Sequence, residues 1–410
     1  MKLLLTIILG AVASVCSAQQ RFVGGDISVL QKYEDYNVAY YDQDGKKIDD
    51  VLKYMKSEAV GWNAQRVRLF VDPTGDKDPQ VCQDLDYVTR LASRIKTEGF
   101  ALMIDFHYSD TWADPAQQTK PKAWSSLTTA QLTDKVYEYT KNCLEHLKAN
   151  GAQPDFIQVG NEITCGMLWP DGRVNSTGYS NWDAFAAFLK AGIKACREVC
   201  PGAKTIIHLE HLQDAAYTVS NYKKLQDLGV DFDVMGLSYY PFWHKDLTTL
   251  STTLRQLAAN FPNKKVQIVE TAYYYQWQPN VGNGIYYDYK NIWPISPAGQ
   301  ASYAKALVTE LKKHDNVNAL YWWFPEENGN GPNSAVLKDW VNRGLWDDNT
   351  HRALPALYEL KAFADDPAGI GNVIQTDSNQ YWYNLQGMRL DGYPQNGGLY
   401  ITEGKKVIVH

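Results

Sequence analysis

The stretch that decides the fold is FIQVGNEITCGMLWP, residues 156–170. It begins with a short apolar run, as a buried strand does, and the run breaks at Gly160-Asn161-Glu162. A charged carboxylate at the tip of a buried strand is costly unless something there uses it. The segment VQIVE, residues 266–270, has the same form and leads into an aromatic run. Two glutamates, Glu162 and Glu270, are therefore predicted to end buried strands.

Short β-type runs alternate along the chain with longer amphipathic segments. Eight such runs separated by helical patterns are typical of a parallel sheet covered by helices. Eight strands also close a barrel, so we predict an α/β fold of the (β/α)₈ TIM-barrel class. An open doubly wound sheet is the alternative, but no Gly-x-Gly-x-x-Gly turn follows the first run. The runs are Phe22–Asp26, Ala64–Val71, Phe100–Phe106, Phe156–Gly160, Lys204–Leu209, Phe232–Leu237, Val266–Val269 and Ala319–Trp323, and the clearest helical patterns are Asp86–Glu98, Leu132–Ala149, Trp182–Val199 and Pro297–Lys313.

Length and charge exclude some classes of protein. A chain of 410 residues can bury a substantial core, and its net charge of −6 comes without any basic stripe of Lys and Arg. Nucleic-acid binding is therefore disfavoured. The 27 Tyr and 13 Trp residues fit either a large aromatic core or ring platforms for sugars, and composition leaves both readings open.

The first residues have the form of an export signal. Lys2 gives a positive start, residues 3–12 are apolar, and Cys16-Ser17-Ala18 is a small-residue cleavage site. We predict a signal peptide over residues 1–18 and an exported protein, in the periplasm, at the cell surface or outside the cell. Lipid attachment at Cys16 is the less favoured alternative. The apolar run is too short to span a membrane, and no other segment is apolar enough.

Composition changes near residue 366. Residues 19–366 carry the alternating pattern and are expected to form one catalytic (β/α)₈ domain, whereas residues 367–410 have no helical period. We predict a short β-rich C-terminal tail there, either a sorting or anchoring device or a stabilising flap. The cysteines beyond residue 18 show no tight spacing, so most are expected to be buried free thiols.

Polar and aromatic residues gather at nearly every predicted strand end. In a barrel of this class, chemistry belongs at the carboxyl ends of the strands. Packing alone would not place so many polar residues there, so these positions form the candidate site. They are Asp26, Arg66, Arg68, Asp105–Trp112, Asn161, Glu162, His208, Glu210, Tyr239, Tyr240, Glu270, Trp322 and Trp323.

Glu162 and Glu270 suit glycoside hydrolysis. That reaction needs one carboxylic acid to protonate the leaving oxygen and one carboxylate to attack the anomeric carbon or to activate water. As ends of the fourth and seventh strands, the two glutamates approach each other across a barrel mouth. The alternative for each is a salt-bridged surface glutamate, which the preceding apolar strand disfavours.

Other groups give weaker signals. Glu326-Glu327 stand in a Gly- and Asn-rich loop, so a solvated turn is predicted for them. Glu210 is kept as a candidate sugar contact. Asp105 and His107 have the residue types of a metal pair, but no third ligand is suitably spaced, and hydrogen bonding to sugar hydroxyls or to Glu162 is favoured. No Gly-x-Ser-x-Gly or His-Glu-x-x-His motif supports a serine nucleophile or a zinc site.

A set of motifs distributed along the barrel carries a family resemblance. They are GNEI with GMLWPDG (160–163 and 166–172), DFHYSDTWADP (105–115) continuing through Gln118 and Pro121 to Trp124, MGLSYYPF (235–242), VETAY (269–273), SPAGQ (296–300) and NRGLWD (342–347). From about residue 24 to residue 358, the chain resembles glycoside hydrolase family 53, the endo-β-1,4-galactanases.

The resemblance implies a retaining (β/α)₈ hydrolase that cuts internal β-1,4-galactosyl bonds of pectic galactan or type I arabinogalactan. On matching positions, Glu162 would be the acid/base and Glu270 the nucleophile. Arg66 would position the nucleophile, and Asn161 would bind the sugar 2-hydroxyl. The residues expected to form the sugar subsites are Tyr240 and Trp323 at the floor, with Asp105, His107, Trp112, Trp124, His208 and Trp346 around them.

The chain also departs from the family pattern. Some members hold calcium in an Asp-rich loop after the seventh strand, but here residues 276–293 carry only Asp288, so we expect no metal and no cofactor. Tyr274 replaces the family's usual proline, and Tyr274, Tyr275 and Trp277 are expected to reshape the donor subsites. Galactan is the expected partner of a monomeric chain.

The residues leave two other functions open. One is another barrel β-glycanase, of the mannanase or cellulase type, with the same glutamates and a different groove. The other is a non-catalytic polysaccharide-binding protein of the cell surface, which would leave both strand-end glutamates unexplained.

Overall fold

The computed structural model describes residues 20–74, 78–329 and 342–365, and toward the C-terminus residues 382–384, 389–390, 394, 398–402 and 405–409. The chain divides into a barrel unit, Arg21–Asp365, and a second, smaller unit that includes the C-terminal segment. The predicted signal peptide, residues 1–18, lies outside the described residues. Within the described ranges, no helix has both the length and the apolar composition needed to cross a bilayer.

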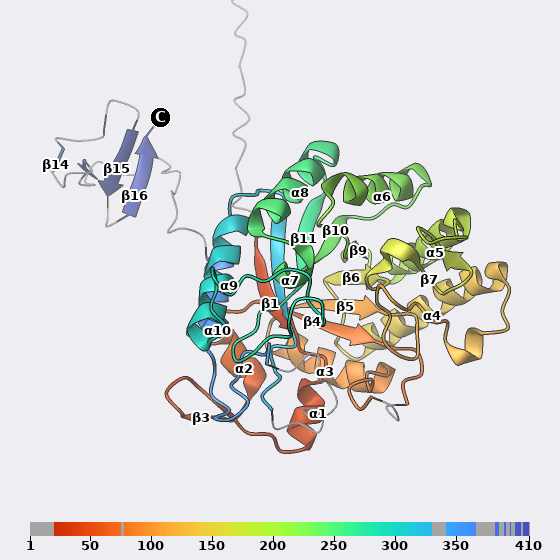
Figure 1. The fold of residues 1–410 in the computed structure, drawn as a ribbon, viewed down its shortest axis with the longest axis horizontal. Coiled ribbons are helices and arrows are strands. Elements are labelled where there is room, and N and C mark those ends of the chain that lie inside the picture. Colours follow the sequence, from red (N-terminus) through yellow and green to blue (C-terminus); the bar gives the residue numbers. More distant parts are fainter. Residues whose placement is uncertain are drawn as a thin grey trace, which may run out of the picture. The chain divides into compact units, whose positions relative to one another are not determined.

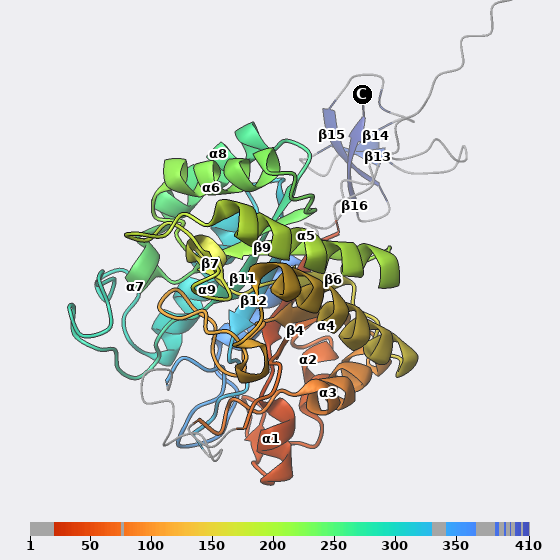
Figure 2. The same cartoon turned by 90° about the vertical axis from the view of Figure 1, so that its right-hand side faces the viewer.

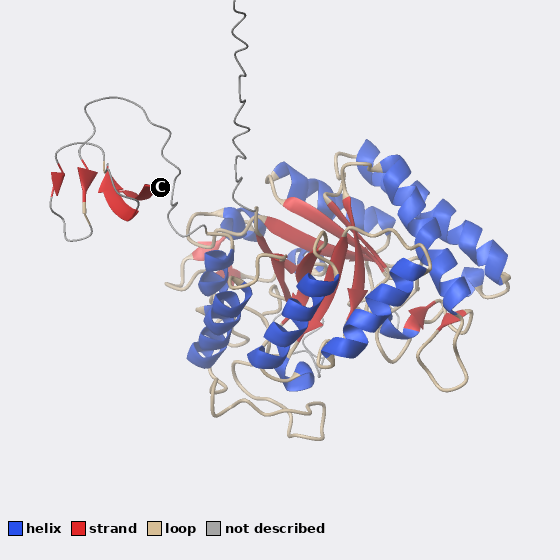
Figure 3. Cartoon of the chain, turned by 90° about the horizontal axis from the view of Figure 1, so that it is seen from above, coloured by secondary structure: helices blue, strands red, loops and turns tan. Residues whose placement is uncertain are grey.

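Eight parallel strands close into a barrel in the order β1, β12, β11, β10, β9, β6, β5, β4. β1 closes the ring because it pairs with β12 on one side and with β4 on the other. Figures 1 and 3 show the strands enclosed by helices, and the predicted (β/α)₈ class is confirmed. The strands are β1 (Phe22–Asp26), β4 (Ala64–Leu69), β5 (Ala101–Phe106), β6 (Phe156–Val159), β9 (Lys204–Leu209), β10 (Val234–Tyr239), β11 (Lys265–Thr271) and β12 (Val317–Trp323).

Several helices begin where the sequence supplies a cap. Thr128 and Gln131 form a capping box at the start of α4, and Ser296 caps α9, whose first residue is Pro297. α4 and α5 lie side by side on the outside of the barrel (Figure 2). The helices are α1 (Leu30–Asp35), α2 (Val51–Lys56), α3 (Leu85–Thr97), α4 (Thr129–Ala149), α5 (Trp182–Val199), α6 (Ala215–Asp227), α7 (Pro241–His244), α8 (Leu247–Asn260), α9 (Pro297–Leu311) and α10 (Ala356–Glu359), with 3₁₀ turns η1 (Lys122–Trp124), η2 (Ile163–Cys165) and η3 (Leu360–Phe363).

The inward faces of the strands change from apolar to polar along their length. The period-two alternation of a strand puts Ala64 and Arg66 on one face of β4, and Ile206 and His208 on one face of β9. The apolar inward-facing side chains make a buried layer. The polar inward-facing side chains come after this layer, toward the carboxyl ends of the strands. This core leaves the chemistry at one mouth of the barrel. The layer contains Ala64, Met103, Phe156, Ile206, Val234, Val269, Ala319 and Tyr321.

Smaller strands complete the chain. The hairpins β2 (Tyr40–Tyr41) with β3 (Lys47–Ile48) and β7 (Gly166–Met167) with β8 (Gly172–Arg173) extend from the barrel. The C-terminal unit holds an antiparallel sheet in the order β14-β13-β15-β16, so the predicted β appendage is confirmed. Its strands are β13 (Trp382–Tyr383), β14 (Arg389–Leu390), β15 (Gly398–Thr402) and β16 (Lys405–Val409). The barrel's cysteines are free, and Cys143, Cys196 and Cys200 are buried, as expected.

Candidate active site

Glu162 comes three residues after the last residue of β6 and occupies a left-handed backbone conformation with φ of +48°. Residues other than glycine adopt this conformation uncommonly, and such positions cluster at functional sites. The turn also needs Gly160, whose φ is +89° and where a Cβ would lie 2.8 Å from Ile163 Cγ2. The chain thus adopts an unfavourable backbone conformation at Glu162, and this conformation presents the Glu162 carboxyl group at the end of the strand.

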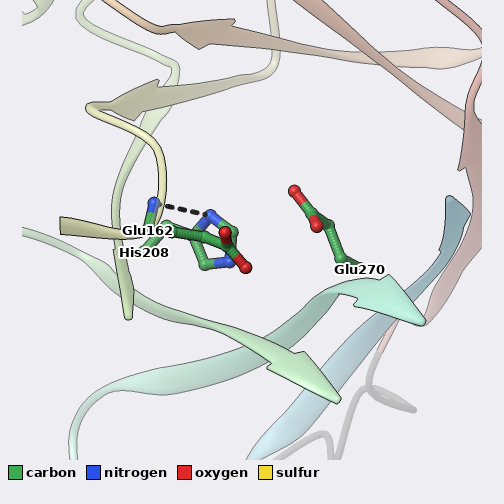
Figure 4. Close-up of side chains that lie close together, drawn as sticks. All are labelled: Glu162, His208 and Glu270. Atoms are coloured by element: carbon green, nitrogen blue, oxygen red, sulfur yellow. Dashed lines mark hydrogen bonds between the residues drawn. The ribbon is translucent and has the colours of Figure 1, made fainter. Parts of the chain in front are cut away.

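Glu270 lies in β11 beside an irregularity of the sheet. The register between β10 and β11 shifts after Leu237 and Ile268, so Ser238 pairs with Glu270 instead of with Val269. Such bulges re-aim a side chain. Carboxylate oxygens of Glu162 and Glu270 lie within 4.8 Å of each other, and Figure 4 shows the two carboxyl groups directed toward each other.

A cavity of about 860 Å³ opens at this mouth of the barrel. Both glutamates line it, and a third glutamate, Glu210, lies in the same wall. Aromatic rings make up much of the remaining wall, which suits sugar rings because they present apolar faces between polar edges. The lining residues are Asp78, His107, Trp112, Ala113, Asp114, Pro115, Ala116, Asn161, Glu162, Glu210, Tyr240, Trp243, His244, Glu270, Gly282, Gly284, Tyr286 and Trp323.

Glu270 is held by one cation and one phenol. Arg66 Nη2 lies 3.0 Å from Glu270 Oε1, and the Tyr240 hydroxyl donates to Oε2 over 2.9 Å. Burial raises the pKa of Glu270 to about 7, while the Arg66 guanidinium acts in the opposite direction. Both contacts favour the charged form of Glu270, which is the form that a nucleophile needs.

Arg66 is itself surrounded by acceptors. Its guanidinium contacts Asp26 at 2.7 Å and Asp105 at 2.8 Å, and it donates to Asn161 Oδ1 over 2.9 Å. Burial lowers the pKa of Arg66, but Asp105, Glu270 and Asp26 together raise it above its ordinary value. Because one cation serves three buried carboxylates, the site keeps Arg66 charged and fixed.

Glu162 has no cation among its described contacts. Its Oε1 accepts a hydrogen bond of 2.6 Å from the Ser238 hydroxyl. Burial, followed by the charges of Glu270 and Glu210, raises the pKa of Glu162 well above its ordinary value. A carboxyl group that keeps its proton near neutrality can serve as a general acid.

His208 is fully buried below Glu162 and does not line the cavity. Burial lowers its pKa well below the ordinary value, so the ring is neutral. His208, Glu162 and Glu270 bring potential metal ligands within 4.8 Å of one another. However, His208 Nε2 faces Ser238 Oγ at 2.8 Å and Nδ1 faces Asn161 Oδ1 at 3.0 Å, so protein groups already occupy both nitrogens. The arrangement fits a carboxylate pair with a supporting histidine better than a metal centre.

The structure brings most of the predicted site residues together. His107, Trp112, Asn161, Tyr240 and Trp323 line the cavity with the two glutamates. Three others, Arg66, Asp105 and His208, are buried beneath it and act through the residues that they contact. Asp105, for example, lies 3.0 Å from His107 Nε2 as well as beside Arg66.

Two predicted subsite residues lie elsewhere. Trp346 is fully buried, and its Nε1 donates to Tyr41 O over 3.2 Å. Trp124, only 2 % exposed, packs edge-on against Tyr139 with ring centroids 5.5 Å apart. Neither lines the cavity, so the prediction that they wall a subsite is corrected. Their large apolar surfaces are used in packing, which sequence alone does not distinguish from sugar stacking.

The solvated turn predicted for Glu326-Glu327 is wrong. Their exposed fractions are 0 % and 2 %, and burial raises the pKa of Glu326 to about 8. Glu326 Oε1 accepts from the Val29 backbone N–H at 2.9 Å, and Glu327 Oε1 accepts from Gly329 N–H at 2.9 Å. Both carboxyl groups serve as internal acceptors: Glu326 links its loop to the segment after β1, and Glu327 closes its own turn.

The loop after β11 differs in part from expectation. Tyr274 and Tyr275 are buried and Trp277 is 46 % exposed, but none of the three lines the cavity. Asp288, the single acidic residue of residues 276–293, pairs with Lys290 at 2.9 Å. The same loop contributes Tyr286 to the cavity wall, a residue that the sequence did not single out.

Sequence reasoning also missed Ser238 and Trp243. Ser238 could have been found, because alternation along β10 puts it on the same inward face as Val234. Trp243 follows the strand in the short helix α7, where no periodic signal tells a wall residue from a surface one. Its Nε1 donates to Gly284 O over 2.8 Å, which links α7 to the loop after β11.

Comparison with known proteins places this geometry in a family. The model of glycosyl hydrolase family 53 matches residues 22–360. The chain belongs to this family. Membership makes the protein a glycoside hydrolase and agrees with the carboxylate pair at the barrel mouth. The family resemblance inferred from the motifs is therefore confirmed.

Individual relatives of this family 53 chain support the same assignment. A probable arabinogalactan endo-β-1,4-galactanase A of Neosartorya fischeri is 33 % identical, covering 76 % of this chain and 86 % of the relative. An endo-β-1,4-galactanase of Bacillus subtilis is 30 % identical, covering 79 % and 73 %. Among solved structures, an Ignisphaera aggregans GH53 catalytic domain aligns with a TM-score of 0.74 at 32 % identity, covering 87 % of this chain and 99 % of the other.

Proposed function

We propose that the protein is a retaining endo-β-1,4-galactanase that hydrolyses pectic galactan or type I arabinogalactan. The observation that carries the mechanism is the approach of the Glu162 and Glu270 oxygens to within 4.8 Å. Retaining glycosidases hold their carboxyl groups about 5–5.5 Å apart, whereas inverting ones leave about 6.5–9.5 Å for a water molecule. The galactanase names of the relatives support the substrate.

In the first step, Glu270 Oε attacks the anomeric carbon while Glu162 gives its proton to the leaving glycosidic oxygen. The bond between the anomeric carbon and that oxygen breaks, and a covalent galactosyl ester forms on Glu270. In the second step, Glu162 takes a proton from water, and the water oxygen attacks the same carbon. The ester bond breaks, Glu270 returns to its charged form, and the configuration is retained.

Several neighbours support these two steps. Arg66 and Tyr240 hold the two oxygens of Glu270, so the nucleophile is charged and oriented before substrate arrives. Asn161 keeps its place beside the sugar through Arg66 and through donation to Ala113 O over 2.8 Å. Trp112 and Trp323, whose ring centroids lie 6.0 Å apart, offer apolar faces for galactose rings.

A side-by-side assay tests the substrate. Reducing ends released from galactan, mannan and cellulose are measured with equal amounts of enzyme. We expect reducing ends to be released from galactan at least about a hundredfold faster than from mannan or cellulose. A site that hydrogen-bonds the hydroxyl groups of its substrate can discriminate by more than this factor. Faster release from mannan or cellulose would replace galactan by that substrate. Binding of galactan without any product would favour a polysaccharide-binding protein instead.

We further propose that the protein is exported and works as a monomer. The amino-terminal pattern that ends at Ala18 supports export. N-terminal sequencing of the mature protein is expected to begin at Gln19, whereas a lipid-modified Cys16 at the N-terminus would indicate an anchored form. Light scattering of the mature chain is expected to give the mass of one copy.

A further inference from the structure

The acid/base candidate is connected to two buried side chains that the mechanism above does not use. The Ser238 hydroxyl donates to Glu162 Oε1 over 2.6 Å, and His208 Nε2 lies 2.8 Å from Ser238 Oγ. The other ring nitrogen, Nδ1, accepts from the backbone N–H of Glu162 over 3.4 Å, the contact drawn in Figure 4. These bonds run from the backbone of Glu162 to its own carboxyl group and form a closed ring.

Hydrogen counting gives each member of this ring a role. A serine hydroxyl carries one hydrogen. When that hydrogen goes to Glu162, Ser238 Oγ must accept from His208, so Nε2 carries the hydrogen of the neutral imidazole. Nδ1 is then an acceptor, which matches the Glu162 N–H and also Gln158 Nε2 at 3.1 Å, whereas the contact of Nδ1 with Asn161 Oδ1 at 3.0 Å carries no hydrogen. Every bond of the ring then has one donor and one acceptor.

The barrel makes room for this arrangement. Gly236 pairs with His208 across β10 and β9. A Cβ at Gly236 would lie 2.8 Å from Ile206 Cγ2, so the bare backbone gives room to β9, the strand that carries His208. The register shift of β10 against β11 then sets Ser238 beside Glu270. Ser238 and His208 are both fully buried, so bulk water does not compete for these bonds.

We propose that Ser238 and His208 are positioning residues that hold Glu162 Oε1 and so commit Oε2 to carry the catalytic proton. This inference rests on the proposed function of Glu162 as acid/base. Because Oε1 is already an acceptor of the Ser238 hydrogen, the proton of the acid form resides on Oε2, which is free to face the leaving oxygen. Once that proton has gone, the Ser238 hydrogen stabilises the carboxylate until it takes a proton from water.

The competing arrangement gives a distinct outcome. If Nδ1 carries the hydrogen and donates to Asn161 Oδ1, which lies 3.0 Å away, the Ser238 hydrogen turns to His208. Ser238 Oγ then accepts from a protonated Glu162 Oε1, and the same contact stabilises the neutral acid. Removal of Ser238 therefore shifts the pKa of Glu162 in opposite directions under the two arrangements.

The test is the titration of the Glu162 carboxyl by carbon NMR in protein labelled at the glutamate carboxyl carbon. The resonance is assigned by its loss in Glu162→Gln. With Ser238→Ala we expect the pKa of Glu162 to rise by about one unit, because a donor to its charged form is lost. Ser238→Cys keeps the shape with a weaker donor and is expected to give a smaller rise. The titratable groups that face Glu162 are Glu210, Glu270, Asp114, Tyr240 and His208.

Ser251→Ala is the matched control. Ser251 is also a buried serine whose hydroxyl contacts a histidine, His314 Nε2 at 3.1 Å, but it lies on α8. We expect no change in the titration of Glu162 in this variant. An unchanged or lowered pKa in Ser238→Ala, in protein that still unfolds cooperatively, would overturn the proposal. The titration needs no turnover, so it decides the matter even if galactan is not the substrate.

The kinetic constants of Ser238→Ala give a second test. A purely structural role of Ser238 would not make the loss of kcat depend on the leaving group of the substrate. On galactan we expect Ser238→Ala to lower kcat about tenfold with KM within about twofold, because the contact acts when the proton moves. An aryl β-galactobioside with a good leaving group needs less proton donation, so its kcat should fall less. Equal loss on both substrates would contradict the assignment of Ser238 to the acid.

Discussion

Glu162 and Glu270 end two strands of one barrel and line the same cavity, yet their surroundings differ in charge. Glu270 is held by the Arg66 cation and the Tyr240 hydroxyl, whereas Glu162 meets a neutral serine and lies near three other carboxyl groups. Burial raises the pKa of both. The cation offsets part of this effect at Glu270 only, so a single proton shared between them belongs on Glu162.

The comparison teaches that role follows from neighbours rather than from residue type. Two identical side chains suit the proposed roles of acid and nucleophile because β4 brings Arg66 to one of them, while β9 brings Glu210 toward the other. Substitution of either glutamate, or of one of these neighbours, is therefore the direct test of the difference between Glu162 and Glu270.

The largest effect is expected for Glu270→Gln. An amide does not form the galactosyl ester, so kcat on galactan should fall by at least about four orders of magnitude. The control is Glu138→Gln, which changes an exposed glutamate on α4. Substantial activity surviving in Glu270→Gln, measured as reducing ends, would remove Glu270 from the nucleophile's role.

Glu162→Gln should be the next most damaging change. Loss of a general acid or base costs about 10²–10⁴-fold, with the greater loss on substrates whose leaving group needs a proton. Added azide should restore turnover of an aryl β-galactobioside, because an anion attacks the ester without a base. The product should be a β-galactosyl azide, since two inversions retain the configuration. An α-galactosyl azide would contradict the retaining mechanism.

Arg66→Gln is expected to change both stability and pH dependence. It leaves Asp105 buried without an arginine partner, while Asp26 keeps Arg68 at 3.2 Å, and the expected cost is about 3–5 kcal/mol in the free energy of unfolding measured in urea. It also removes the charge that lowers the pKa of Glu270, so the acid limb of kcat/KM should move to higher pH. Arg94→Gln, which breaks the partly exposed pair with Glu34, should cost under about 1 kcal/mol and leave the limb in place. An acid limb at lower pH in Arg66→Gln would contradict this account.

The smallest effect is expected for Glu210→Gln. Glu210 is negative at high pH and raises the pKa of Glu162, so its neutralisation should lower that pKa. The alkaline limb of kcat/KM should then move to lower pH by less than about one unit. Asp288→Asn, in a surface pair with Lys290, is the matched control. A shift of the alkaline limb upward would show that Glu210 acts on Glu162 in another way.

The fold was predictable because its signal is local and repeated. Each buried strand is an apolar run such as Phe156–Gly160, and each helix has its own period, so eight repeats point to one closed sheet without any knowledge of long-range contacts. The sequence also identified Glu162 and Glu270, because a carboxylate at the end of an apolar strand stands out against its surroundings. Trp124 and Trp346 were misplaced since an aromatic residue after a strand is equally suited to a cavity wall and to the core.

The sequence by itself determined the alternation of strands and helices and the two strand-end glutamates. Short stretches of chain suffice for this, because each one shows the spacing of its apolar residues and therefore which residues are buried. Tertiary structure alone decided what surrounds each glutamate. The shift of β10 against β11 sets Ser238 opposite Glu270, and Gly236 gives room to Ile206 of β9, the strand that also carries His208. Such contacts join strands that are remote in sequence, and the electrostatic energy of a buried carboxyl depends on all of them together.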